Sequence, residues 1–191
     1  LIFLNNSGDI SNNNNRAINP QNLDGYFRLI NSGSIGGNQV ALDLTGASAN
    51  AATAIEIHNG YSVNASGQIV ASTSGEREIK TTASNAILLD NVSGDITLAN
   101  AAGASIIAEN TLAIAASGVT GNVTLSNAGN IRAHREATGV SNERAITLSA
   151  ITGDIDFLST AGTIDARDLT VNLETIGGKI TFSNAGTISA T

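Results

Sequence analysis

The feature that most constrains the fold is a phrase that occurs twice in succession near the C-terminal end. Residues 145–166 read AITLSAITGDIDFLSTAGTIDA, and residues 169–190 read LTVNLETIGGKITFSNAGTISA. Each copy contains three short runs rich in β-branched residues, separated by a Gly turn and an Ala-Gly turn. A phrase that recurs with its turns in place predicts a solenoid, in which stacked repeats share one continuous core.

Further copies of the phrase extend towards the N-terminus. Within each run apolar and polar residues alternate, which is the pattern of a strand with one buried face. The sequence therefore predicts an all-β protein: a right-handed parallel β-helix of triangular cross-section, with three strands per coil and about seven coils. We expect one solenoid segment over residues 1–191, belonging to a longer protein. Its coils are less regular over residues 1–70 and regular over residues 86–191.

The aligned copies also predict the core. Equivalent apolar residues should stack into columns that run along the solenoid. One wall is expected to contain Ile96, Val123, Ile155 and Ile180, and another Ile106, Ile131, Ile164 and Ile188.

A second repeated element lies between the second and third runs, where an Asn is followed two residues later by Gly, as at Asn31 and Gly33 or Asn127 and Gly129. Gly readily adopts the positive φ of a tight corner. Asn side chains stacked at the strand spacing of about 4.8 Å can form an internal ladder of amide hydrogen bonds. We favour this ladder over a ligand site. One copy carries Thr160 at the Asn position.

Two long connections are expected between coils. If residues 40–44, 54–57 and 68–70 are the three runs of one coil, residues 71–85 form a long connection to the next coil. Residues 134–143 form a second one, which would leave the same corner with its base about 10 Å from the first. Insertions in a solenoid gather on one edge, and that edge is often the binding face.

These connections also carry much of the charge, which suggests a recognition surface for acidic partners. The alternative is that mixed charges on protruding loops merely keep them in solution. If the edge binds, the expected contact residues are Arg77, Lys80, Arg132, His134, Arg135 and Arg144.

Composition excludes several other functions. The net charge of −7 argues against non-specific binding to nucleic acid and to anionic lipid. The chain has no Cys, no phosphate-binding glycine motif and no apolar run long enough to span a membrane. Its two histidines, His58 and His134, have no partners at metal-ligand spacing, so we expect neither a metal nor a cofactor.

A polysaccharide-active enzyme is the main catalytic alternative. Glycoside hydrolysis needs two carboxylates that face one cleft, and Asp154, Asp156 and Asp165 would have to provide them. Asp154 lies in a Gly-Asp turn, and Asp165 is expected to pair with Arg132 on the neighbouring strand. With 3% aromatic residues, few rings are available to stack on a sugar. We therefore predict a non-catalytic protein.

The phrase that ends in Asn-Ala-Gly-x-Ile, at residues 123–131 and 180–188, resembles the β-helix of bacterial autotransporter passenger domains. Related phrases occur in adhesins exported by two-partner secretion. The resemblance implies a protein that crosses the outer membrane and is secreted or displayed on the bacterial surface, and the absence of Cys agrees with such export.

As a passenger, the chain would be an adhesin or a receptor-directed virulence effector. Its partner would be a host cell-surface protein, a receptor, or a matrix component or glycan, bound by a monomer. A purely structural spacer remains the third possibility, because a shared fold does not carry a function with it.

Overall fold

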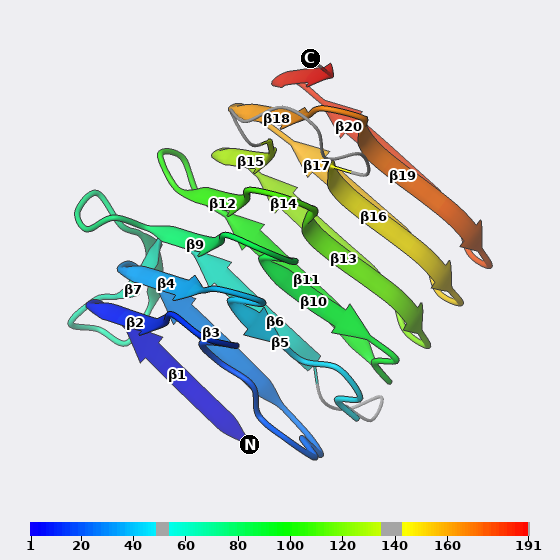
Figure 1. The fold of residues 1–191 in the computed structure, drawn as a ribbon. Coiled ribbons are helices and arrows are strands. Elements are labelled where there is room, and N and C mark those ends of the chain that lie inside the picture. The colour runs from blue at the N-terminus through cyan, green and yellow to red at the C-terminus, as the bar shows by residue number, and fades with distance from the viewer. Residues whose placement is uncertain (49–53, 135–142, 191) are drawn as a thin grey trace.

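The computed structural model describes residues 1–48, 54–134 and 143–190, and this part of the chain contains strands and turns but no helix. The strands lie side by side in layers along one axis (Figure 1). Every strand in the three large sheets is parallel to its neighbours. Parallel strands stacked in this way confirm the prediction of an all-β solenoid.

Two of the sheets contain seven strands each. The strands of sheet 1 are β1 (Ile2–Asn6), β3 (Phe27–Asn31), β6 (Ala54–Asn59), β11 (Asp95–Asn100), β14 (Val123–Asn127), β17 (Ile155–Ser159) and β20 (Ile180–Asn184). The strands of sheet 2 are β2 (Asp9–Asn12), β4 (Ser34–Gly37), β9 (Glu78–Thr81), β12 (Ser105–Ala108), β15 (Asn130–Ala133), β18 (Thr163–Ala166) and β21 (Thr187–Ala190).

Sheet 3 is the third wall of the stack. Its five strands are β5 (Leu42–Asp43), β10 (Ile87–Asp90), β13 (Leu112–Val119), β16 (Arg144–Ile151) and β19 (Leu169–Ile176). From β10 onwards the chain visits sheets 3, 1 and 2 in turn, and the triples that begin at β13, β16 and β19 repeat this order. The three runs of each sequence phrase are therefore three strands on three walls.

The core consists of apolar columns, as the aligned phrases predict. On sheet 1, Ile96 pairs in register with Val123, and the column continues through Ile155 to Ile180. On sheet 2, the residues in register are Ile106, Ile131, Ile164 and Ile188. Both predicted columns are confirmed in register, although their last members, Ile180 and Ile188, are 45% and 38% exposed. Because each side chain contacts equivalent residues above and below, small aliphatic groups fill the interior without large rings.

An amide ladder runs along the corner between sheets 1 and 2. Asn6 donates from Nδ2 to Oδ1 of Asn31, and Asn31 donates to Asn59, in both cases at 2.8 Å. Asn59 donates to Asn100, and Asn100 to Asn127, at 2.9 Å. Every member of this ladder after Asn6 is at most 1% exposed. The predicted ladder is confirmed, with Asn59 as an additional member.

The ladder is interrupted one residue away from the predicted position. Ser159, rather than Thr160, is in register with both Asn127 and Asn184. Ser159 is buried, and its hydroxyl donates to the carbonyl of Ala161 at 3.3 Å. This corner is one residue longer than those that follow Asn31, Asn127 and Asn184, which is why a count back from Gly162 gave the wrong residue.

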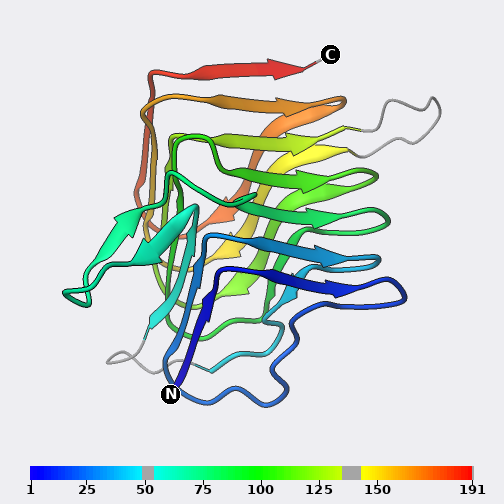
Figure 2. The same cartoon turned by 90° about the vertical axis from the view of Figure 1, so that its left-hand side faces the viewer.

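One strand assignment from the sequence is wrong. Residues 68–70 do not form the third strand of their coil, because Ile69 belongs to a small antiparallel hairpin of β7 (Tyr61–Val63) and β8 (Ile69–Ala71). The third strand is β9, whose fully buried Ile79 is in register with Ile35 and Ile106. The hairpin projects to the left of the stacked strands in Figure 2.

The two insertions therefore leave different corners, and the prediction of one shared edge is wrong. The hairpin is inserted between sheets 1 and 2, whereas residues 135–142 connect sheet 2 to sheet 3. Residues 71–85 are not one loop, because they contain β9. The hairpin also divides the corner motif: Asn59 supplies the ladder amide, while Gly75 lies against the backbone of Ser32.

Candidate functional site

The outward face of sheet 2 brings together two of the predicted contact residues. Lys80 on β9 and Arg132 on β15 lie in one outward column, two strands apart, with Ile107 between them. Gly36 precedes Lys80 in this column, and Asp165 follows Arg132. Side chains alternate between the two faces along each strand. Because Ile79 and Ile131 are buried in the core, the column that contains Lys80 and Arg132 faces outward.

Of these two cations, Lys80 is held by an ion pair, whereas the ion pair expected for Arg132 is not formed within the described part of the chain. Lys80 Nζ forms an ion pair with Glu109 Oε1 at 2.9 Å, and this hydrogen bond raises the pKa of the Lys80 ammonium. Arg132 faces Asp165 in register, but Asp165 accepts a hydrogen bond from Ser189 Oγ at 2.8 Å. The expected Arg132–Asp165 ion pair is absent from the ion pairs of the described residues.

The other predicted contact residues lie elsewhere. Arg77 lies in the turn before β9, and its guanidinium donates to the carbonyls of Ser72 and Ala102 at 3.0 and 3.2 Å. Its contacts therefore hold a corner together.

The remaining residues do not complete the predicted edge. His134 follows β15, and its backbone N–H donates to Ala108 at 3.1 Å. Arg144 begins β16 on sheet 3, a different wall of the solenoid. Arg135 lies outside the described residues. The predicted contact set is thus distributed over several surfaces.

Two hollows lie on the outward face of sheet 2, one on each side of Ile107. The N-terminal hollow has a volume of about 410 Å³ and the C-terminal one about 340 Å³. The first is lined by Ser11, Asn12, Asn13, Ser34, Gly36, Gly37, Asn38, Glu78, Lys80 and Thr82. The second is lined by Ser105, Ile107, Asn130, Ile131, Arg132, Thr163 and Asp165.

The N-terminal hollow exists because Gly36 occupies an outward position that carries a larger side chain on the following strands. A Cβ atom added to Gly36 would have Ser11 Cβ as its only neighbour within 4 Å, at 4.0 Å. Gly37 is different, because its Cβ would lie 2.2 Å from the Val40 carbonyl oxygen. Gly36 therefore leaves space for solvent or a ligand, whereas Gly37 permits a close backbone approach.

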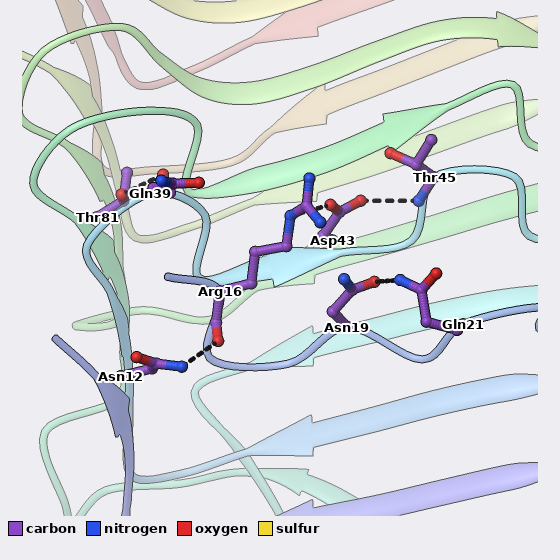
Figure 3. A network of polar contacts seen from close by, with 8 residues as sticks. All are labelled: Asn12, Arg16, Asn19, Gln21, Gln39, Asp43, Thr45 and Thr81. Carbon is purple, nitrogen blue, oxygen red and sulfur yellow. Dashed lines mark hydrogen bonds and ion pairs between the residues drawn. The ribbon is translucent and has the colours of Figure 1, made fainter. Parts of the chain in front are cut away.

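One wall of this hollow is held in place by a polar network (Figure 3). Asn12 Oδ1 accepts hydrogen bonds from the backbone N–H groups of Asn14 and Asn15, and its Nδ2 donates to the Arg16 carbonyl at 3.0 Å. Arg16 Nε pairs at 2.7 Å with Asp43, whose side chain is 2% exposed. The asparagine tract at residues 12–15 is thus a turn anchored to sheet 3.

Glu78 is a half-buried carboxylate on the same face. Burial raises the pKa of its carboxyl group, with the nearby Lys80 ammonium opposing the shift. At neutral pH the ionised group is therefore less well solvated than an ordinary surface glutamate. A carboxylate kept in such an environment beside an open hollow is a candidate binding group.

A second polar cluster, which sequence reasoning missed, lies on the outward face of sheet 1. Glu56 accepts hydrogen bonds from Arg28 Nε at 2.7 Å and from His58 at 3.3 Å. Burial opposes ionisation of Glu56, but these hydrogen bonds lower its pKa overall. Arg28 also lies 5.1 Å from the Tyr26 ring centre, and His58 packs edge-on against Tyr61 of the hairpin.

The charges of this cluster are paired with one another, and the cluster joins the base of the hairpin to sheet 1. It gathers both tyrosines of the chain, although their spacing in the sequence gave no indication of this. We therefore assign it a structural role.

The three aspartates considered for catalysis do not share a cleft. Asp154 Oδ1 accepts a hydrogen bond from the Lys179 backbone N–H at 2.7 Å, which confirms its role in a turn. Asp156 lies on sheet 1 and Asp165 on sheet 2. The outward faces that carry Asp156 and Asp165 thus belong to different walls, whereas a glycoside hydrolase needs its two carboxylates to face one cleft.

Among residues 1–48, 54–134 and 143–190, no group of three or more His, Cys, Asp or Glu side chains is arranged to hold a metal ion. The same residues include no helix of the length and apolarity needed to cross a membrane. Comparison of the chain with protein-family models, with curated proteins and with solved structures gave no match.

Proposed function

We propose that this chain is a non-catalytic binding segment of a bacterial passenger protein, secreted or displayed on the cell surface. In this proposal the solenoid is right-handed, has about seven coils and acts as a monomer. It acts as an adhesin or as a receptor-directed effector, and its partner is a host cell-surface or matrix component. The resemblance of residues 123–131 and 180–188 to passenger β-helices supports the export route.

The observation that carries the binding role is the arrangement on sheet 2. Lys80 and Arg132 lie in one outward column, and a hollow adjoins each of them. A rigid sheet holds these groups at fixed positions, so little conformational entropy is lost when a partner binds. The Lys80 ammonium, although paired with Glu109, and the Arg132 guanidinium can both donate hydrogen bonds from the rims of these hollows to hydroxyl-rich groups of a partner.

Removing both cations tests this role. The variant Lys80→Gln/Arg132→Gln should bind cultured mammalian cells or immobilised matrix at least roughly tenfold more weakly, because each lost charged contact at a binding face weakens association. Binding is measured by titrating fluorescently labelled protein.

The matched control is Lys179→Gln/Arg144→Gln, which removes the same charge at the start of β16 on sheet 3 and just before β20 on sheet 1. The control should bind as the unmodified chain does. Equal losses in the two variants would indicate non-specific electrostatic attraction. Full binding by both would leave sheet 2 without a binding role and would favour the spacer.

A further inference from the structure

We propose that the hollow around Gly36 is a subsite for a neutral saccharide, with the Glu78 carboxylate as the acceptor for sugar hydroxyl groups. This inference rests on the proposed binding function of sheet 2 and specifies the ligand that one part of this face would take. It follows from the space, the polar groups and the charge of the hollow.

The space is suitable for a small ligand. The hollow has a volume of about 410 Å³, which is within the range of small-molecule sites. Gly36 forms its floor without a side chain, and Ser11 Cβ is 4.0 Å from the position of an added Cβ. A sugar ring could therefore approach the sheet backbone closely.

The polar groups match hydroxyls, each of which both donates and accepts a hydrogen bond. Glu78 provides two acceptor oxygens, and the hydroxyls of Ser11 and Ser34 can act in either direction. Asn38 Oδ1 accepts a hydrogen bond from Thr82 at 2.9 Å, which orients its NH₂ group as a donor. Two vicinal hydroxyl groups, as found on a hexose, can each donate a hydrogen bond to one oxygen of a carboxylate.

The charge favours a neutral sugar over an acidic one. Lys80 is the cation that lines this hollow, and its ammonium is already paired with Glu109. The Glu78 carboxylate is consequently left to dominate the local charge. A sulfated, sialylated or uronic ligand would bring its anion towards Glu78, and like charges in a partly buried site repel.

The site is also preformed. The Asn12 turn and the Arg16–Asp43 ion pair fix one wall, while β4 and β9 fix the floor and the opposite wall. No aromatic residue is among the described side chains that line the hollow, so ring stacking does not contribute. We therefore expect weak binding per subsite, with a Kd on the order of 1 mM.

Saturation-transfer NMR measures binding at this strength. Glucose, galactose, mannose and N-acetylglucosamine are each tested with the intact chain, with glucuronic acid as an anionic comparison. At least one neutral sugar should receive saturation, and glucuronic acid should receive less. Gly36→Gln fills the hollow where the backbone has room and should abolish the signal, and Glu78→Gln should reduce it at least roughly fivefold.

The control is Thr124→Gln, at an exposed outward position on sheet 1, and it should retain the full signal. Circular dichroism and thermal melting check that each variant is folded. A signal that survives Gly36→Gln, or that is stronger for glucuronic acid, would overturn the inference.

The same proteins also separate this inference from the proposed function. If no neutral sugar binds while cells are still bound through Lys80 and Arg132, the saccharide subsite is wrong and the binding face stands. If cells are not bound either, both proposals fail.

Discussion

Replacing Asn100 by alanine should destabilise the protein by about 3 kcal/mol, since each buried polar group left without a partner costs about 1–3 kcal/mol. Asn100 accepts from Asn59 and donates to Asn127 Oδ1 and to the Asn130 carbonyl. The Asn127 oxygen would lose its donor in an interior that water does not reach. The denaturation midpoint in urea, followed by circular dichroism, measures the loss.

Asn184→Ala is the matched control, because Asn184 is in register with the ladder but solvent-exposed. Its Nδ2 donates to the Gly186 carbonyl at 2.8 Å, and water can replace this contact. Its cost should be no more than about 1 kcal/mol. If Asn100→Ala were no more costly than this control, the ladder would not stabilise the stack.

Gly33→Ala is expected to have an effect of similar size for a steric reason. A Cβ atom on Gly33 would lie 2.1 Å from the Gly8 carbonyl oxygen and 2.8 Å from the Gly8 nitrogen. Backbone atoms cannot rotate out of the way as a flexible side chain does, so adjacent strands would have to separate at this corner. We expect destabilisation of about 3 kcal/mol or more, measured as a fall in the urea midpoint.

Gly8→Ala is the internal control, because Gly8 has the same place in the corner motif after Asn6 that Gly33 has after Asn31. An added Cβ at Gly8 meets nothing within 4 Å. Its stability should change by less than about 1 kcal/mol. A comparable loss in both variants would mean that Gly is needed for its own conformation, and that close stacking of the corners does not explain it.

The parts of the fold that follow from a local period could be predicted from the sequence. Columns such as Ile106 and Ile131, and the amides of Asn100 and Asn127, recur at the same place in each phrase, and their stacking needs no further information. The phrase is less regular around the hairpin. There Ile69 and Ile79 both follow the strand pattern, and only burial inside the stack decides between them.

A signal for the hairpin was nevertheless present. Two short runs, at residues 61–63 and 69–71, are separated by a polar segment that contains Gly67, which is typical of a hairpin. Unless residues 61–71 are assigned to the hairpin, the strand that contains Lys80 cannot be aligned with β4. The hollow around Gly36 could therefore not be predicted from the sequence. The site thus depends on a register across coils that separate phrases do not reveal.

The most direct test of the binding face uses the absence of Cys from the chain, since each introduced thiol is then unique. Ile107→Cys lies between Lys80 and Arg132 on sheet 2, Thr124→Cys lies on sheet 1, and Ser149→Cys lies on sheet 3. Each variant is coupled to a bulky maleimide, and its binding to cells is compared with that of the uncoupled protein.

We predict that the label at position 107 weakens cell binding at least roughly tenfold by covering the contact surface, while the labels at positions 124 and 149 leave it within about twofold. Undiminished binding with the label at position 107, or equal losses at all three positions, would contradict the assignment of the binding face to sheet 2.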